Sequence, residues 1–171
     1  KMKQVNDEVP YIMIGHSMGS FLTRVYMSRF GRDLAGVVLS GTAQMPQAVS
    51  TMGNTLAHLI GTVRGMDHRS KFLDGMGAGG YGKRIAGAKT DLDWLNTSDK
   101  AVKAYADDPA CGFMFSAGGY CALTNLTKTI AQDTTARRVP NDLPMLFVSG
   151  SDDPVGDFGE GPTKAAQQMI D

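Results

Sequence analysis

The clearest chemical signal in the sequence is a serine between two glycines. Residues 15–19 read Gly-His-Ser-Met-Gly and join an apolar run that predicts a strand to an amphipathic stretch that predicts a helix. Such a turn strains the serine backbone and aims Ser17 out of the sheet, while Gly15 and Gly19 let strand and helix pass closely. The Met18 N–H, unpaired at the helix start, is placed to stabilise an oxyanion. This pattern suits acyl transfer by a serine nucleophile, although a plain strand–helix turn could also contain it.

A second group of polar residues follows another predicted strand. Residues 143–150 read Leu-Pro-Met-Leu-Phe-Val-Ser-Gly, and the loop after them contains Asp152, Asp153 and Asp157. In serine hydrolases, an acid in such a loop holds a histidine in the tautomer that accepts the serine proton. All three aspartates qualify by position, and each could instead cap the next helix.

The elements that position these residues predict an α/β fold. Strand, helix and strand over 9–14, 20–30 and 34–41 form a βαβ unit with a right-handed crossover, whose parallel sheet should be buried on both faces. The next hundred residues show helical but no convincing strand patterns, with an irregular glycine-rich loop at 75–82. We expect further helices over 47–63 (interrupted by Gly53), 100–106, 119–130 and 161–170.

Three parts of the chain resemble one family. The Gly-His-Ser-Met-Gly turn, the segment 143–156 with its Ser-Asp-Asp-Pro-Val-Gly end, and cap-like segments at 93–95, 108–109 and 111–115 are similar to α/β-hydrolases of the lysophospholipase and monoacylglycerol-lipase group, also described as serine aminopeptidase-like. The resemblance covers nearly the whole chain. It implies a partial α/β-hydrolase fold, with a parallel sheet core in 1–43 and 140–171 and a mainly helical cap or lid insertion in 44–139.

The resemblance also implies roles for single residues. It selects Asp153 as the acid, with Asp152 as the fallback, beside Ser17 as nucleophile and Met18 as oxyanion donor. The reaction implied is hydrolysis of a carboxylic ester, in particular a monoacyl lipid ester, without metal or organic cofactor. Alternation around Gly112 suggests an extended segment whose aromatic side chains contact substrate, namely Phe113 and Phe115. The alternative is that such apolar residues form the core of the insertion itself.

The expected histidine is missing. The family order is serine, acid, histidine, but His16, His58 and His68 all precede Asp153. We expect His16 to pack or to form a hydrogen bond beneath the site, and His58 and His68 to serve the insertion or the surface. The sequence is therefore interpreted as a fragment that lacks N-terminal strands and the catalytic histidine, and whose open sheet would pair with the rest of the hydrolase chain or with itself.

Composition excludes other classes. With 171 residues, 17 Lys+Arg against 17 Asp+Glu and a net charge of +0, the chain lacks the basic excess of nucleic-acid binders. Its apolar runs fall short of the roughly 18–20 residues of a membrane span, and two cysteines without a signal-peptide pattern favour the cytoplasm. The basic residues at 83–84, 89 and 137–138 are expected to be solvated.

Two other functions stay open. A chain without its general base could be a catalytically incompetent fragment or a binding module, because a serine hydroxyl is a poor nucleophile at neutral pH. A serine aminopeptidase-like peptide hydrolase would need an acidic pocket for the substrate amino group, which Asp91, Asp93 and Asp107 could supply.

Overall fold

A three-stranded parallel sheet organises residues 8–170, the part of the chain that the computed structural model describes. Its strands are β1 (Ile12–His16), β2 (Gly36–Ser40) and β3 (Met145–Val148), in the order β1-β2-β3. All pairs are parallel, and Val38 lies opposite Ile14 on one side and Leu146 on the other. The expected α/β class and parallel sheet are confirmed.

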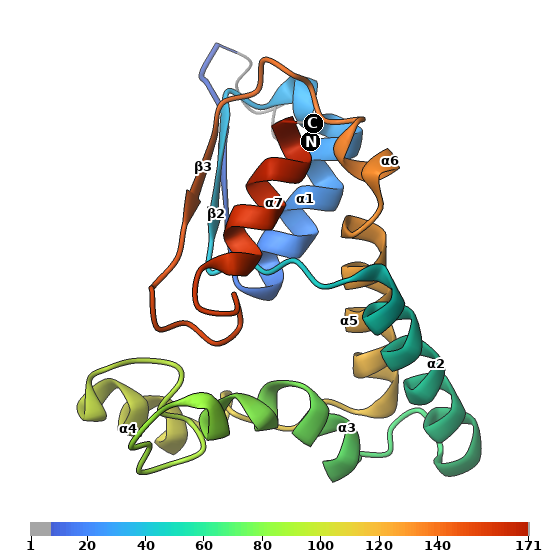
Figure 1. The fold of residues 1–171 in the computed structure, drawn as a ribbon, viewed down its shortest axis with the longest axis vertical. Helices are drawn as coiled ribbons and strands as arrows, with labels where there is room; N and C mark the ends of the chain where they lie inside the picture. Colours follow the sequence, from blue (N-terminus) through green and yellow to red (C-terminus); the bar gives the residue numbers. More distant parts are fainter. Residues whose placement is uncertain (1–7, 171) are drawn as a thin grey trace.

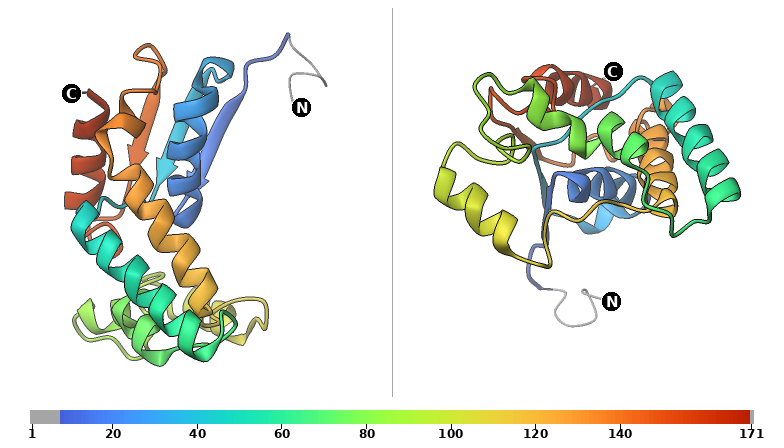
Figure 2. Two further views of the ribbon diagram at one scale, coloured as in Figure 1. Left: turned by 90° about the vertical axis from the view of Figure 1, so that its right-hand side faces the viewer. Right: turned by 90° about the horizontal axis from the view of Figure 1, so that it is seen from below.

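Only one face of this sheet is covered. Helices α1 (Met18–Phe30) and α7 (Glu160–Ile170) lie on the same face (Figures 1 and 2). Alternate strand side chains, including Val37 and Leu39, pack there against the fully buried Met27 of α1. On the opposite face Ile14 is 72% and Leu146 is 56% exposed. The expectation of a sheet buried on both faces is therefore wrong for the described residues, because no described helix covers the second face.

The segment between β2 and β3 is helical. It contains α2 (Gln47–Arg64), α3 (Lys71–Met76), the 3-10 helix η2 (Ala78–Arg84), α4 (Asp99–Asp107), α5 (Ala117–Ile130) and α6 (Asp133–Ala136), while a short 3-10 helix, η1 (Gly31–Asp33), precedes β2. Helices α2 and α5 pack side by side, and α3, η2 and α4 lie beyond the carboxyl ends of the strands (Figure 1). We call residues 44–139 the helical insertion; that it acts as a cap stays a prediction.

Most expected helices are present, with two corrections. Gly53 does not interrupt α2, which runs unbroken to Arg64. The glycine-rich stretch is not irregular, because it ends α3 and then forms η2. One reason why this stretch is regular is that the Tyr81 ring contacts the Trp94 ring, with centroids 5.1 Å apart, and so anchors η2.

A buried arginine joins the core to the insertion. Arg24 of α1 is fully buried and donates to the backbone oxygens of Ala43 at 3.0 Å and Ile130 at 3.3 Å. The same guanidinium donates to the side-chain oxygens of Gln44 and Gln168, at 2.6 and 3.0 Å. Burial lowers the pKa of Arg24 to about 10. Because Ile130 ends α5, the negative end of that helix dipole faces the guanidinium and offsets part of the desolvation cost.

The cysteine and membrane expectations can also be compared with the structure. Cys111 and Cys121 are both free thiols in the structure. Among the helices of residues 8–170, none combines the length and apolarity needed to cross a bilayer.

Candidate active site

Ser17 occupies a strained turn where β1 becomes α1. Its backbone has φ 52° and ψ −124°, a left-handed value that is uncommon for a residue with a side chain. Two neighbours hold the turn. The Ser17 N–H donates to the backbone oxygen of Ser40 at 2.9 Å, and the Ser20 hydroxyl donates to the backbone oxygen of Ser17 at 2.6 Å. Met18 is the first helical residue, so its N–H has no acceptor within the helix. The strained strand–helix turn expected from the sequence is present.

The two glycines of the motif have different surroundings. A Cβ on Gly15 would lie 2.4 Å from the Thr23 hydroxyl, 2.6 Å from the Gly19 oxygen and 2.8 Å from the Ser20 Cα, so only glycine fits there. A Cβ on Gly19 would meet nothing within 4 Å among the described residues. Close passage of strand and helix therefore accounts for Gly15, whereas the same expectation is wrong for Gly19 in this part of the chain.

The loop after β3 brings one aspartate to the edge where Ser17 lies. The Val155 N–H donates to Asp153 Oδ1 at 2.9 Å, which fixes the carboxylate. Asp153 Oδ2 and His16 Cε1 flank Gly41, at 3.5 and 3.4 Å from the position that a Cβ on this residue would occupy. Gly41 directly follows β2, and its N–H donates to the Val148 oxygen of β3 at 2.8 Å. The Asp153 carboxylate and the turn of Ser17 thus lie at the same carboxyl edge of the sheet.

The other two aspartates face elsewhere. Asp152 is exposed, and its carboxylate is 3.5 Å from the hydroxyl of the neighbouring Ser151. Asp157 forms an ion pair with Arg84. The geometry therefore favours Asp153 among the three candidates.

None of the three histidines contacts the Ser17 hydroxyl in the described part of the chain. The His16 Nδ1 atom pairs with the Ser40 hydroxyl at 3.1 Å, so this ring turns along the strand ends. His58 is exposed on α2, and His68 lies between α2 and α3, where its backbone oxygen accepts from Ala117. The positions of His58 and His68 agree with the surface or insertion roles expected from the sequence. His16 is exposed among the described residues, so the packing role is wrong there, and its bond to Ser40 agrees with the hydrogen-bonding role.

An apolar groove begins beside the serine turn. It has a volume of about 550 Å³, lies between α1 and α5, and is lined by residues that include Met18, Leu22 and Phe115. Phe115 also contacts Tyr120 of the insertion core, with ring centroids 5.8 Å apart. Phe113 is not among the groove residues and is 56% exposed, with its ring centroid 6.5 Å from that of Phe115. The structure brings Met18 and Phe115 together and leaves Phe113 at the periphery.

Comparison with known proteins adds the family. Residues 1–170 match the profile of the hydrolase family described as serine aminopeptidase, S33. The chain belongs to this family. A comparison with curated protein sequences gives no significant match.

Solved structures agree with the S33 family fold. A thermostable carboxyl esterase from Bacillus coagulans is 27% identical with a TM-score of 0.87, and the alignment covers 99% of this chain and 55% of the esterase. A lipase in its open form is 24% identical with a TM-score of 0.84, over 98% of this chain and 56% of the lipase. A monoacylglycerol lipase from Paleococcus ferrophilus is 20% identical with a TM-score of 0.59, over 98% and 56%. The S33 chain thus spans about half the length of the structures that it matches.

Sequence reasoning missed two residues of the insertion that reach the loop after β3. This loop carries Asp153 and is called the acid loop below. Arg84 is exposed, as expected, but it also donates to the backbone oxygen of Pro154 at 2.9 Å and pairs with Asp157. Tyr81 lies close enough that Asp153 adds to the effect of burial in raising its phenol pKa, while Arg84 opposes it. An aromatic residue inside a glycine-rich run was a usable signal for Tyr81, whereas the pair at 83–84 gave none that separated Arg84 from Lys83.

The acidic residues of the insertion do not form a shared pocket. The Asp93 carboxylate accepts from the Thr90 N–H at 3.2 Å and from the hydroxyl of the same residue. Asp107 pairs with Lys103 at 2.7 Å one helical turn away, and Asp91 is exposed. Within residues 8–170, His, Cys, Asp and Glu side chains form no group of three suited to a metal ion.

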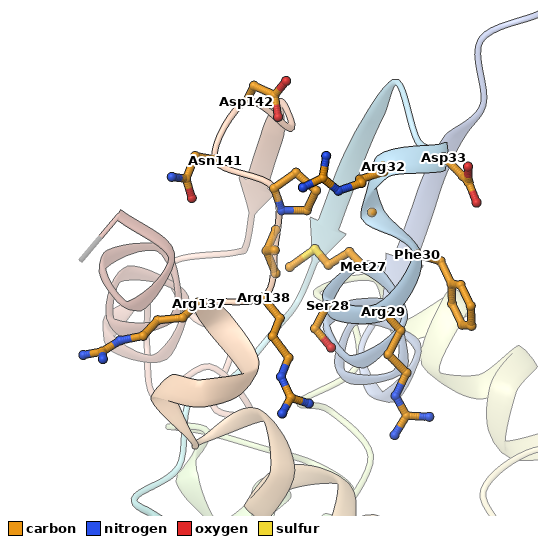
Figure 3. A pocket seen from close by; sticks show the side chains of 13 residues that line it. Met27, Ser28, Arg29, Phe30, Arg32, Asp33, Arg137, Arg138, Asn141 and Asp142 are labelled. Carbon is orange, nitrogen blue, oxygen red and sulfur yellow. The ribbon is translucent and has the colours of Figure 1, made fainter.

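A cavity of about 560 Å³ lies far from the serine turn, at the opposite end of α1 (Figure 3). Its lining includes Arg29, Arg32, Arg137 and Arg138. In Figure 3 the side chain of Arg137 points to the left, Arg29 and Arg138 point downward and Arg32 lies above them, so the four guanidinium groups do not converge on one ligand position.

Proposed function

We propose that this chain carries the nucleophile and the acid of a serine ester hydrolase that acts through an acyl-enzyme on Ser17. The observation that carries the proposal is the strained Ser17 backbone at the head of α1, on the same sheet edge as Asp153. A left-handed serine is costly and persists where function requires an exposed nucleophile. Membership of a hydrolase family and the likeness to a carboxyl esterase support the same reaction.

The chemistry follows from these positions. The Ser17 oxygen attacks the ester carbonyl carbon, and its proton passes to a histidine supplied from outside this sequence, which Asp153 orients. The Met18 N–H donates to the oxyanion of the tetrahedral intermediate. The histidine then protonates the departing alcohol, and an activated water cleaves the acyl-serine to release the acid. Every step uses protein groups and water, so the proposed reaction requires no cofactor.

The substrate class that we propose is a monoacyl lipid ester. The groove that begins at Met18 is lined mainly by apolar side chains, which suits an acyl chain. Phe115 lies in this groove, whereas Phe113 would meet a longer substrate at its exposed end.

The test uses the complete gene product that contains this sequence. A fluorophosphonate probe should add one equivalent to the wild type, detected by intact mass, and none to Ser17→Ala. Ser28→Ala on the same helix is the matched control, because its hydroxyl bonds only within α1. The adduct should appear in this control as in the wild type. Wild-type protein that stays unmodified, or a modified Ser17→Ala variant, would refute the proposal.

A catalytically incompetent fragment or binding module is the second candidate. The observation that favours it is that the Ser17 hydroxyl has no base among the described residues. Labelling of the complete gene product together with an unreactive 171-residue chain would show that the chain alone lacks its base. No labelling of either would favour the binding module.

A serine aminopeptidase-like activity is the third candidate and is supported by the description of the family. Local pairing of Asp93 and Asp107 speaks against the acidic pocket expected for it. Comparing kcat/KM for monoacyl glycerol esters of increasing chain length with that for an aminoacyl amide decides between ester and amino-terminal peptide substrates.

A further inference from the structure

The loop that carries Asp153 ends in a strained turn. Asp157 and Phe158 have φ values of 51° and 57°, and Gly159 follows at 97°, so three successive residues are left-handed. Only the last of them is a glycine, for which this conformation is free of steric cost. A turn of this kind persists when contacts from outside the loop hold it.

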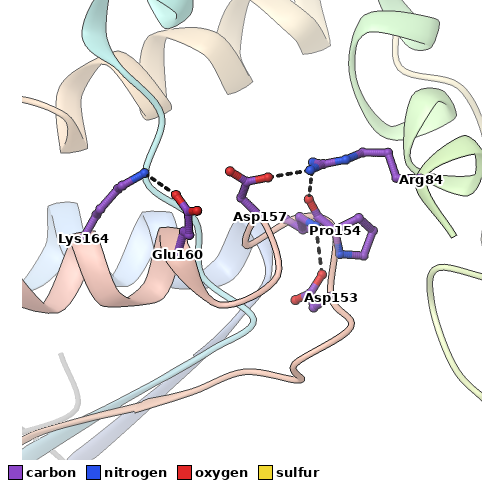
Figure 4. Close-up of polar contacts among 7 residues, drawn as sticks. Arg84, Asp153, Pro154, Asp157, Glu160 and Lys164 are labelled. Carbon is purple, nitrogen blue, oxygen red and sulfur yellow. Dashed lines mark hydrogen bonds and ion pairs between the residues drawn. The ribbon is translucent and has the colours of Figure 1, made fainter.

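One side chain of the insertion, that of Arg84, contacts this loop at both Pro154 and Asp157 (Figure 4). Arg84 ends η2, and its Nη1 donates to the Pro154 oxygen at 2.9 Å. Its Nη2 forms an ion pair with Asp157, and its Cζ lies 4.8 Å from the ring centroid of Phe158. A planar guanidinium with several fixed donors can make these contacts at once, which an ammonium cannot.

Hydrogen bonds also join this strained turn to Asp153. The Phe158 N–H donates to the Asp153 backbone oxygen at 3.0 Å, and the Val155 N–H donates to its carboxylate at 2.9 Å. Pro154, whose oxygen Arg84 holds, is buried and directly follows Asp153. Arg84 therefore contacts the loop before and after Val155, the residue whose N–H fixes the Asp153 carboxylate.

We propose that Arg84 is a positioning residue that latches the helical insertion to the acid loop and holds the Asp153 carboxylate in its catalytic orientation. This inference rests on the proposed function, because it gives Asp153 the role of the acid. Arg84 and Asp157 are 41% and 56% exposed, so water weakens the ion pair taken alone. The three contacts converge on one short loop, and their combined effect is to restrict its backbone.

The experiment compares Arg84→Gln, Arg84→Lys and the control Lys83→Gln in the complete gene product. Lys83 precedes Arg84 in η2, is exposed, and its side chain makes no hydrogen bond or ion pair within the described residues. For Arg84→Gln we expect kcat for a monoacyl ester to fall roughly 10- to 100-fold, since a misplacement of about 1 Å costs rates of this order. KM should change less than about twofold, because substrate binding is not the affected step. Arg84→Lys should restore part of kcat, and Lys83→Gln should behave as the wild type.

A second readout is independent of activity. Amide hydrogen exchange of residues 150–159 should accelerate about tenfold or more in Arg84→Gln, while α2 and α7 keep their wild-type protection. Asp157→Asn removes the ion pair from the other side and should accelerate the same segment to a smaller extent. Wild-type exchange in this loop, or a uniform acceleration in every helix, would overturn the latch. An unreactive wild-type Ser17 would refute the proposed function instead, and the exchange data would still decide the latch.

Discussion

Replacing Gly15 with alanine tests the contact between strand and helix that aims the serine. The added Cβ would lie 2.6 Å from the Gly19 oxygen and 2.8 Å from the Ser20 Cα, whereas ordinary contacts begin at 3.4 Å. Both atoms are backbone atoms of the first turn of α1, so relief requires the helix start to retreat by about 0.6–0.8 Å. Overpacking of this kind costs about 1–3 kcal/mol. The same retreat would move Ser17 and the Met18 N–H away from the reacting carbonyl.

Thermal unfolding and ester turnover of the complete gene product measure both effects. We expect Gly15→Ala to lower Tm by about 2–10 °C and kcat by at least about tenfold. Gly19→Ala is the matched control and should raise stability by up to about 1 kcal/mol, because alanine favours a helix and meets nothing within 4 Å among the described residues. Adding Thr23→Ala to Gly15→Ala should rescue only part of the loss, since two of the three close atoms remain. Equal effects at both glycines, or a complete rescue, would refute the reasoning.

Three further predictions concern the serine, the acid and a buried phenol. Ser17→Gly should have a free energy of unfolding about 1 kcal/mol higher than Ser17→Ala, measured by urea denaturation. Both variants lose the hydroxyl, but only glycine adopts φ 52° without strain. Asp153→Asn should lower kcat by about 10³–10⁴-fold and leave the circular dichroism spectrum unchanged. Burial, reinforced by the hydrogen bond to Asp74 at 2.8 Å, raises the pKa of Tyr120 above the ordinary value of about 10. The folded protein then keeps a proton that the unfolded chain releases, so this stabilisation is complete below about pH 10 and is lost as pH rises through the folded pKa. Tyr120→Phe should lower the free energy of unfolding by about 1 kcal/mol at pH 8, and the difference from the wild type should be smaller at pH 11, as measured by urea denaturation. An equal difference at both pH values would show that the phenol does not titrate as described.

The order of elements could be predicted from the sequence because it depends on local patterns. Apolar periodicity placed α2 and α5 within two residues of their observed starts. The expected strand from residue 9 begins instead at Ile12, and a proline at position 10, which has no N–H to donate, accounts for part of this difference. The strained serine was also predictable, because the motif and the flanking strand and helix are neighbours in the chain.

Contacts between distant residues could not be predicted in this way. Arg84 and Asp157 are separated by 73 positions, and nothing in the local pattern distinguishes Arg84 from the solvated Lys83. The burial of each sheet face depends on which elements lie on it, so the apolar character of Ile14 could not reveal that its side chain is 72% exposed. Similarly, the space beside Gly15 and Gly19 depends on which atoms lie next to each glycine, so the motif alone could not show that only Gly15 is closely packed.

Two arginines attach the helical insertion to the core at separate points. Arg24 reaches the last carbonyl of α5 from the middle of α1. It is buried and has no carboxylate partner among residues 8–170, so its hydrogen bonds break only with a large desolvation cost. Arg84 reaches the loop of Asp153 from η2 and is 41% exposed, so water lowers the cost of breaking its contacts relative to those of the buried Arg24. The α5 end of the insertion is thus the fixed attachment, and η2 is the attachment able to release. Because η2 contacts the loop of Asp153, a displacement of the insertion about α5 would loosen this loop before it disturbed the serine turn.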